Sequence, residues 1–188
     1  MEIIPFLGLI GVVLGASIAW RRAQLNQRTQ YTFELYRYFY SDDFSKVRTM
    51  ARNFRAYLEK HQKLCTYYFI YIDINDLNQE TRQEYYELIT SYAGVLYFFS
   101  WLVEHLNARL ITKRSLIRLF KHVFEWWYLH SIKAFIIIYE RELQNVNDVD
   151  AKSLRINRLA SKPPWVANLK KLSEMMQLDS WPATKNRC

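Results

Sequence analysis

The sequence predicts an all-α protein in which one N-terminal transmembrane helix continues into a cytoplasmic helical bundle. Residues 3–20 form an unbroken uncharged run, and three of the four glycines lie in the first fifteen residues, which leaves too few turn residues for a β-sandwich or barrel. Apolar residues make up 51% and charged residues 23%, the balance of a folded chain. We expect an anchor over residues 1–22, a bundle over 23–145, and a loop, a short helix and a frayed tail over 146–188.

The first element is expected to cross a membrane. The uncharged run from Ile3 to Trp20 would span roughly 27 Å as a helix, about the thickness of a hydrocarbon core. Because Arg21 and Arg22 follow at once, the positive-inside rule places the N-terminus outside and the rest of the chain in the cytoplasm, with Trp20 at the headgroup level. This predicts a single-pass protein of the cell inner membrane, with the lipid bilayer and its anionic headgroups as partners.

Two other interpretations of the run stay open. A cleaved signal peptide would use the small residues Ser17 and Ala19 at its cleavage site, but it needs basic residues before the apolar run, and this chain has none there. A buried core helix is the other interpretation, although such a long uncharged stretch is unusual for one.

A face of small residues runs along the same segment. Gly11, Gly15 and Ala19 recur every four residues, a GxxxG-type pattern that lets two membrane helices approach closely. The pattern predicts a homo-oligomer, and the alternative is that glycine is simply frequent in membrane helices.

Two helices are expected before residue 60. Residues 22–40 contain no Gly or Pro and continue the first helix as a stalk. The segment Ser41-Asp42-Asp43 ends that stalk and caps the next helix, expected over residues 43–60, with its acids placed well for the helix dipole. Residues 64–74 are rich in β-branched and aromatic types and are expected as a short strand or a buried aromatic segment.

A long helix is expected over residues 79–107, with Asn78 as its N-cap. Apolar side chains lie on both of its faces, so we expect it to be central and nearly surrounded. Residues 88–103 carry no charge and could form a second span, but Glu84, Glu87 and Glu104 make the stretch too short, which favours a bundle helix.

The remaining elements follow from caps and prolines. Thr112 is the expected N-cap of a helix that ends near Leu143, with a loop over residues 145–159. Pro163 and Pro164 start a short helix over residues 165–177, because proline is favoured in the first helical turn. The helix after Thr112 is expected to hold one periodic apolar face, formed by Leu116, Leu119, Phe120, Val123, Trp127, Ala134, Ile137 and Ile138.

The anchor, the basic stalk, the helix start SDDFSKVR and the run YFFSWLVEHLNARLITKRSLIRLFKHVFEWW together resemble the DUF4760 family of bacterial membrane-anchored helical proteins. The resemblance rests mainly on residues 97–127, with residues 44–48 as weaker support. It implies an anchor and a helical fold and no known activity, and the style of the family suggests a role in bacterial stress or phage response.

Residues typical of catalytic or metal sites are scarce. His122 and His130 lie two turns apart on one helix, but no Cys or carboxylate stands with them at a zinc spacing, and solvated or packing histidines are the favoured interpretation. Glu125 beside two tryptophans could be a carboxyl with a raised pKa, although a place on the solvated helix edge is more usual. No cofactor, metal or catalytic residue is expected.

Basic residues gather in two helical segments of a chain with a net charge of +8. They could attract anionic headgroups, bind nucleic acid together with the neighbouring Tyr and Trp, or form an ordinary solvated face. The two basic faces consist of Lys46, Arg48, Arg52 and Arg55, and of Lys113, Arg114, Arg118 and Lys121.

The function predicted from these observations is that of a membrane-anchored helical protein, not an enzyme, that acts through contacts with an unidentified protein partner or with the membrane. The alternative is a membrane-tethered module that binds nucleic acid through its basic helix faces.

Overall fold

A computed structural model describes residues 4–60, 79–137 and 164–178, with side chains for 13–54, 83–84, 86–137 and 165–178. Every element in these ranges is helical, which confirms the all-α class. The expected strand or aromatic segment over 64–74, the loop over 145–159, the N-cap Asn78 and the C-terminal tail lie outside the described residues. The elements are α1 (Ile4–Phe39), α2 (Asp42–Lys60), α4 (Gln79–Asn107), α5 (Lys113–Trp127), the π-helical turn η2 (Tyr128–Ile132) and α8 (Pro164–Met176).

Side-chain caps set two of the helix starts. The Ser41 hydroxyl oxygen accepts a hydrogen bond from the Phe44 backbone N–H at 3.3 Å, and Asp42 and Asp43 lie in the first turn of α2. Thr112 caps α5 in the same way, because its hydroxyl accepts from the Ser115 backbone N–H at 3.2 Å. The predicted stop between α1 and α2 and the predicted cap of α5 are therefore confirmed.

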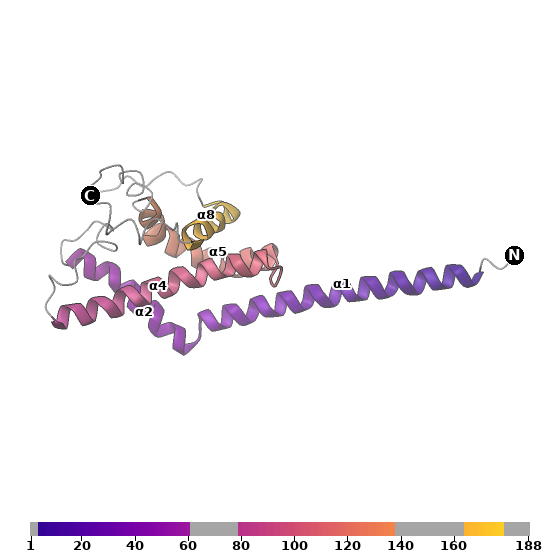
Figure 1. The fold of residues 1–188 in the computed structure, drawn as a ribbon, viewed down its shortest axis with the longest axis horizontal. Coiled ribbons are helices and arrows are strands. Elements are labelled where there is room, and N and C mark those ends of the chain that lie inside the picture. Colours follow the sequence, from indigo (N-terminus) through magenta and orange to yellow (C-terminus); the bar gives the residue numbers. More distant parts are fainter. Residues whose placement is uncertain (1–3, 61–78, 138–163, 179–188) are drawn as a thin grey trace, which may run out of the picture.

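Helix α1 projects from the bundle as one continuous helix, and its N-terminal end lies farthest from the other elements (Figure 1). This confirms that the stalk continues the first helix. Among the described parts of the chain, however, no helix is long and apolar enough to cross a membrane.

The predicted localisation is thereby contradicted. A single pass through the inner membrane, with the N-terminus outside and the C-terminal domain in the cytoplasm, required a spanning helix that the described residues do not provide. The prediction of Trp20 at the headgroup level depended on that span, and so did the prediction of Arg21 and Arg22 as its inner flank. Both predictions are therefore withdrawn. Ile3 lies outside the described residues.

The core of the bundle is aromatic and centres on Phe39, the last residue of α1, which is 1% exposed. Its ring lies 4.9 Å from that of Phe98 and 5.6 Å from that of Phe99, both on α4, and 5.2 Å from that of Phe44 on α2. It also meets Phe120 of α5 edge to face at 6.4 Å. One side chain of α1 therefore contacts three other helices at once, in the tilted and edge-on geometries that aromatic pairs prefer.

Helix α4 is the central helix, packed most extensively against α2 and α8. A Cβ placed on Gly94 would lie 3.2 Å from Cγ1 of Val47, so the missing side chain lets α2 approach closely. The prediction that α4 is nearly surrounded is correct for one face only. Tyr97 is 60% exposed and Trp101 is 41% exposed, because no described helix covers that side.

The short helix α8 begins at Pro164, as expected, and packs on α4. Its Leu169 and Leu172 side chains are buried, and Asn168 Nδ2 donates to the Ser100 hydroxyl oxygen at 2.9 Å. Lys171 Nζ donates to Asn107 Oδ1 at 2.7 Å. Residues 164–178 are therefore packed against the central helix of the bundle.

The helix after Thr112 does not keep one α-helical register. In an ideal α-helix, the residues buried before the π turn and those buried after it would point in directions about 100° apart around the helix axis. A π turn contains one extra residue, and this extra residue rotates the later part of the helix so that both sets face the core. The single periodic face that we predicted is wrong beyond Trp127 for this reason: Ala134 and Ile137 are exposed, while Ile132 and Phe135 are buried. Ile138 lies outside the described residues.

Candidate functional surfaces

The first candidate surface is a stripe along α1. Thr32, Leu35 and Phe39 are buried against the bundle. The same face of the helix continues outward through Leu25, Ile18 and Leu14, which are 51%, 53% and 56% exposed. We call these last three residues the α1 stripe. Spacings of three and four residues connect the positions from 14 to 39, which is the heptad pattern of paired helices, with Arg21 and Arg28 at two of its positions.

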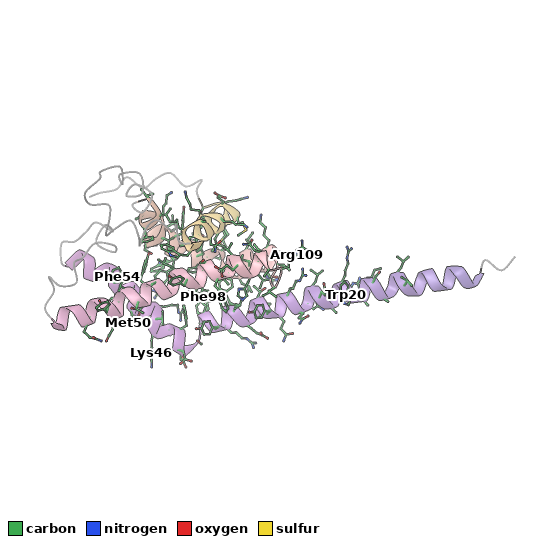
Figure 2. The ribbon with its side chains drawn as sticks, viewed as in Figure 1. Trp20, Lys46, Met50, Phe54, Phe98 and Arg109 are labelled. Atoms are coloured by element: carbon green, nitrogen blue, oxygen red, sulfur yellow. The ribbon has the colours of Figure 1, made fainter. Side chains whose placement is uncertain are left out.

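The predicted small-residue face lies beside this stripe and is uncovered in the described structure. A Cβ placed on Gly15 would meet nothing within 4 Å, and Ala19 is exposed. The surroundings of Gly11 lie outside the description. Figure 2 shows Trp20 on the same projecting part of α1, away from the bundle, where it is 64% exposed.

The second candidate surface joins cations and aromatic rings where α1, α2 and α5 meet. Cζ of Arg52 lies 4.8 Å from the centre of the Trp126 ring. The Trp126 ring stacks on His130, with ring centres 4.8 Å apart and planes at 18°. His130 Nδ1–H donates to the Trp126 carbonyl oxygen at 2.7 Å, which fixes the orientation of the imidazole.

A second arginine extends this surface toward α1. Cζ of Arg48 lies 5.0 Å from the centre of the Phe39 ring and 4.8 Å from that of Tyr40, distances typical of cation–π contacts. Burial and a hydrogen bond with Tyr36 raise the pKa of the Tyr40 phenol, while Arg48 and Arg52 lower it, so both guanidinium groups lie close to that phenol. We call Tyr40, Arg48, Arg52, Trp126 and His130 the junction surface.

Arg48 and Arg52 of the junction surface have no carboxylate partner among the residues that the structure describes. Among the described residues, no Asp or Glu oxygen lies within 4.0 Å of Arg48 or Arg52. The Arg48 Nε atom is buried and has no hydrogen-bond partner in this part of the chain. Glu125, next to Trp126 in sequence, instead lies 3.9 Å from His122 Nδ1. The junction surface is therefore positively charged, and its arginines are held by aromatic rings.

The predicted basic faces are divided by the structure. Arg48 and Arg52 point to the α1–α5 side, Lys46 is exposed at another angle of α2 (Figure 2), and the Arg55 side chain lies outside the description. On α5 three of the four predicted residues, Arg114, Arg118 and Lys121, lie on the side opposite the buried residues, whereas Lys113 is at the helix start. Lys113, Arg114 and Arg118 are exposed there, and Lys121 is half-buried.

The histidines have packing or surface roles in the described structure. His105 is buried, with Nδ1 2.9 Å from the Trp101 carbonyl oxygen and Nε2 2.9 Å from the Tyr31 hydroxyl. His122 is on the solvent side of α5, and His61 lies outside the description. No group of three His, Cys, Asp or Glu residues suited to a metal ion occurs within the described ranges.

The sequence predicted the arginines of the junction surface and a contribution from neighbouring Tyr and Trp, but not which aromatic rings the arginines contact. Arg52 and Trp126 are far apart in sequence, and nothing local connects them. The signal that could have found them is composition: Tyr36 and Tyr40 end one helix directly before the basic helix, and Trp126 ends another.

Comparison with known proteins returns no match among family models, curated proteins or solved structures.

Proposed function

We propose that this protein is a non-catalytic assembly module that pairs with a second copy of itself through the projecting part of α1. The observation that carries the proposal is the α1 stripe. Leu14, Ile18 and Leu25 are more than half exposed, yet they extend the face that packs Leu35 and Phe39 into the bundle. A heptad-spaced apolar face of this kind gains stability when a second helix covers it.

The charge of Arg21 and the length of the exposed part of α1 favour an antiparallel pair. In a parallel pair each Arg21 would face its own copy across the seam, and like charges in that position repel. An antiparallel pair places Leu14 against Ile18 of the second copy and separates the two Arg21 side chains. The Thr29 hydroxyl lies 3.5 Å from that of Ser115 on α5, whereas the described side chains of residues 13–23 are all exposed and available to a second helix. The two bundles then lie at opposite ends of the pair.

The first test is the mass of the full chain in solution, measured by light scattering over a wide range of protein concentration. We expect a dimer that Leu14→Gln with Ile18→Gln converts to a monomer. The matched control is Ala16→Gln with Ala23→Gln, two exposed positions on another side of the same helix, which should leave the dimer intact. A monomer at every concentration, or equal loss in both double variants, would overturn the proposal.

Cross-linking tests the orientation of the pair. In a background with Cys65→Ser and Cys188→Ser, a mixture of Leu14→Cys and Ile18→Cys chains should form a disulfide between copies on oxidation. Leu14→Cys alone should not, because in an antiparallel pair the two copies of position 14 are apart. Efficient cross-linking of Leu14→Cys alone would indicate a parallel pair.

A further inference from the structure

We propose that the junction surface binds single-stranded nucleic acid, with Arg48 and Arg52 contacting phosphates and the exposed aromatic side chains contacting bases. This inference is independent of the pairing of α1. It requires three properties in one place: positive charge that no carboxylate of the described residues neutralises, aromatic surface that a base can reach, and cations held at the edge of that aromatic surface.

The charge is available because no carboxylate of the described residues lies within 4.0 Å of either arginine. An arginine in an ion pair must give up that partner before it binds phosphate, whereas Arg52, which is exposed, has none to give up in the described structure. Phosphate oxygens also suit guanidinium groups, which present several N–H donors in one plane.

The aromatic surface is available because Tyr40 is 46% exposed and Trp126 is 40% exposed. Each ring is therefore partly open to solvent, although Arg52 and His130 lie against Trp126 and Arg48 lies over Tyr40. Bases stack on such rings regardless of sequence, because every base has a π-face.

The cations and rings are held together rather than scattered. Arg52 lies over Trp126 at 4.8 Å, Trp126 stacks on His130, and Arg48 lies over Tyr40 at 4.8 Å. These residues come from three separate segments of the chain, so the fold places them side by side before any ligand arrives. A preorganised surface loses less conformational entropy on binding than isolated side chains would.

Single strands are favoured over the other polyanions that such a surface could attract. An acidic peptide would use the arginines but has no planar bases for the exposed rings. A nucleic-acid duplex keeps its bases stacked internally, so it too would leave the rings unused. The acidic peptide and the duplex are therefore the alternative ligands that the experiment compares with the single strand.

The experiment measures binding of the full chain to a fluorescently labelled single-stranded RNA of mixed sequence, by anisotropy over a salt series. A duplex of the same sequence and a poly-glutamate peptide of equal charge serve as competitors. We expect the single strand to bind and both competitors to displace it poorly. Arg52→Gln should weaken binding by about tenfold and reduce the slope of log K against log salt by about 0.7, the change expected for one phosphate contact on a single strand.

Trp126→Leu keeps an apolar side chain but removes the ring, and it should weaken binding by at least about fivefold. Lys46→Gln is the matched control, because it removes one positive charge from the same helix at another angle, and it should change binding by less than about twofold. Circular dichroism and thermal unfolding check that each variant is folded.

Absence of binding to the RNA, equal displacement by poly-glutamate or duplex, or equal weakening by Lys46→Gln and Arg52→Gln would each overturn the proposal. The Leu14→Gln with Ile18→Gln variant separates this proposal from the assembly of the protein. As a monomer it should still bind RNA through each junction surface, so a failure of pairing and a failure of RNA binding are distinguishable.

Discussion

Nε2 of His105 lies 2.9 Å from the hydroxyl oxygen of Tyr31, and this contact joins α4 to α1 across 74 residues of sequence. Because the Trp101 carbonyl can only accept, we assign the imidazole proton to Nδ1, which leaves Nε2 as the acceptor of the Tyr31 hydroxyl proton. Both ring nitrogens of a buried histidine are then satisfied, and the Tyr31 ring also stacks on the imidazole with ring centres 5.6 Å apart.

Replacement of Tyr31 by Phe should therefore destabilise the bundle. The change keeps the stacked ring and leaves His105 Nε2 buried without its donor, which costs about 1–3 kcal/mol. Urea unfolding followed by circular dichroism measures the loss. Tyr97→Phe, which removes a hydroxyl from an exposed position on α4, should change the free energy of unfolding by less than about 0.5 kcal/mol. Equal effects in the two variants would show that the His105–Tyr31 contact contributes little.

Alkaline pH should destabilise the fold through Tyr92. Burial raises the pKa of its phenol above the ordinary value of 10.0, and a hydrogen bond with Ser131 partly offsets this effect. Above pH 10 the folded state therefore retains a proton that the unfolded state has lost, so the free energy of unfolding falls as pH rises, while below pH 10 this group has no effect. Tyr92→Phe should flatten the decline measured in urea above pH 10, and the exposed Tyr86→Phe should not.

Replacement of Arg109 by Gly should stabilise the C-terminal end of α4. Arg109 has φ of 59°, the left-handed conformation that disfavours residues with a Cβ, and the Leu110 backbone N–H donates to the His105 carbonyl at 2.9 Å to close the cap. Arg109→Gly should raise the free energy of unfolding by about 0.5–1 kcal/mol in chemical denaturation. Arg118→Gly, an exposed arginine in the interior of α5, should lower it by about 1 kcal/mol. A loss in both variants would contradict the role of the cap.

Deletion of one residue from the π turn should be tolerated. Removal of the exposed Leu129 converts the turn to an ordinary α-helix and keeps Ile132 and Phe135 on the core side, at a cost of about 1–2 kcal/mol from the altered contact between Tyr92 and Ser131. The α-helical part of α5 contains no extra residue, so deletion of the exposed Arg118 should rotate the following residues away from the core. This deletion should abolish cooperative unfolding. Thermal denaturation of both deletions checks this, and equal loss would refute the register argument.

The helices could be predicted from local sequence signals, whereas the contacts between distant segments could not. Ser41 and Thr112 act through hydrogen bonds to residues three positions away, so the sequence alone reveals their helix starts. The π turn was not predictable, because the extra residue can be recognised only from the set of side chains that the neighbouring helices bury. The burial of α8 on α4 and the meeting of Arg52 with Trp126 likewise depend on packing between distant segments. The membrane prediction was wrong on a different ground: no helix of the described residues is long and apolar enough to cross a membrane.

The position of Phe39 has a consequence for how the chain emerges from the ribosome. Two of its ring partners, Phe98 and Phe99, are about sixty residues later in sequence, and synthesis at 5–20 residues per second delays their arrival by about 3–12 s. During that interval α1 and α2 present Phe39, Phe44 and Phe54 to water without the helix that covers them. A chaperone that shields aromatic side chains on nascent chains therefore has a defined interval in which to act, and that interval closes when α4 has been made.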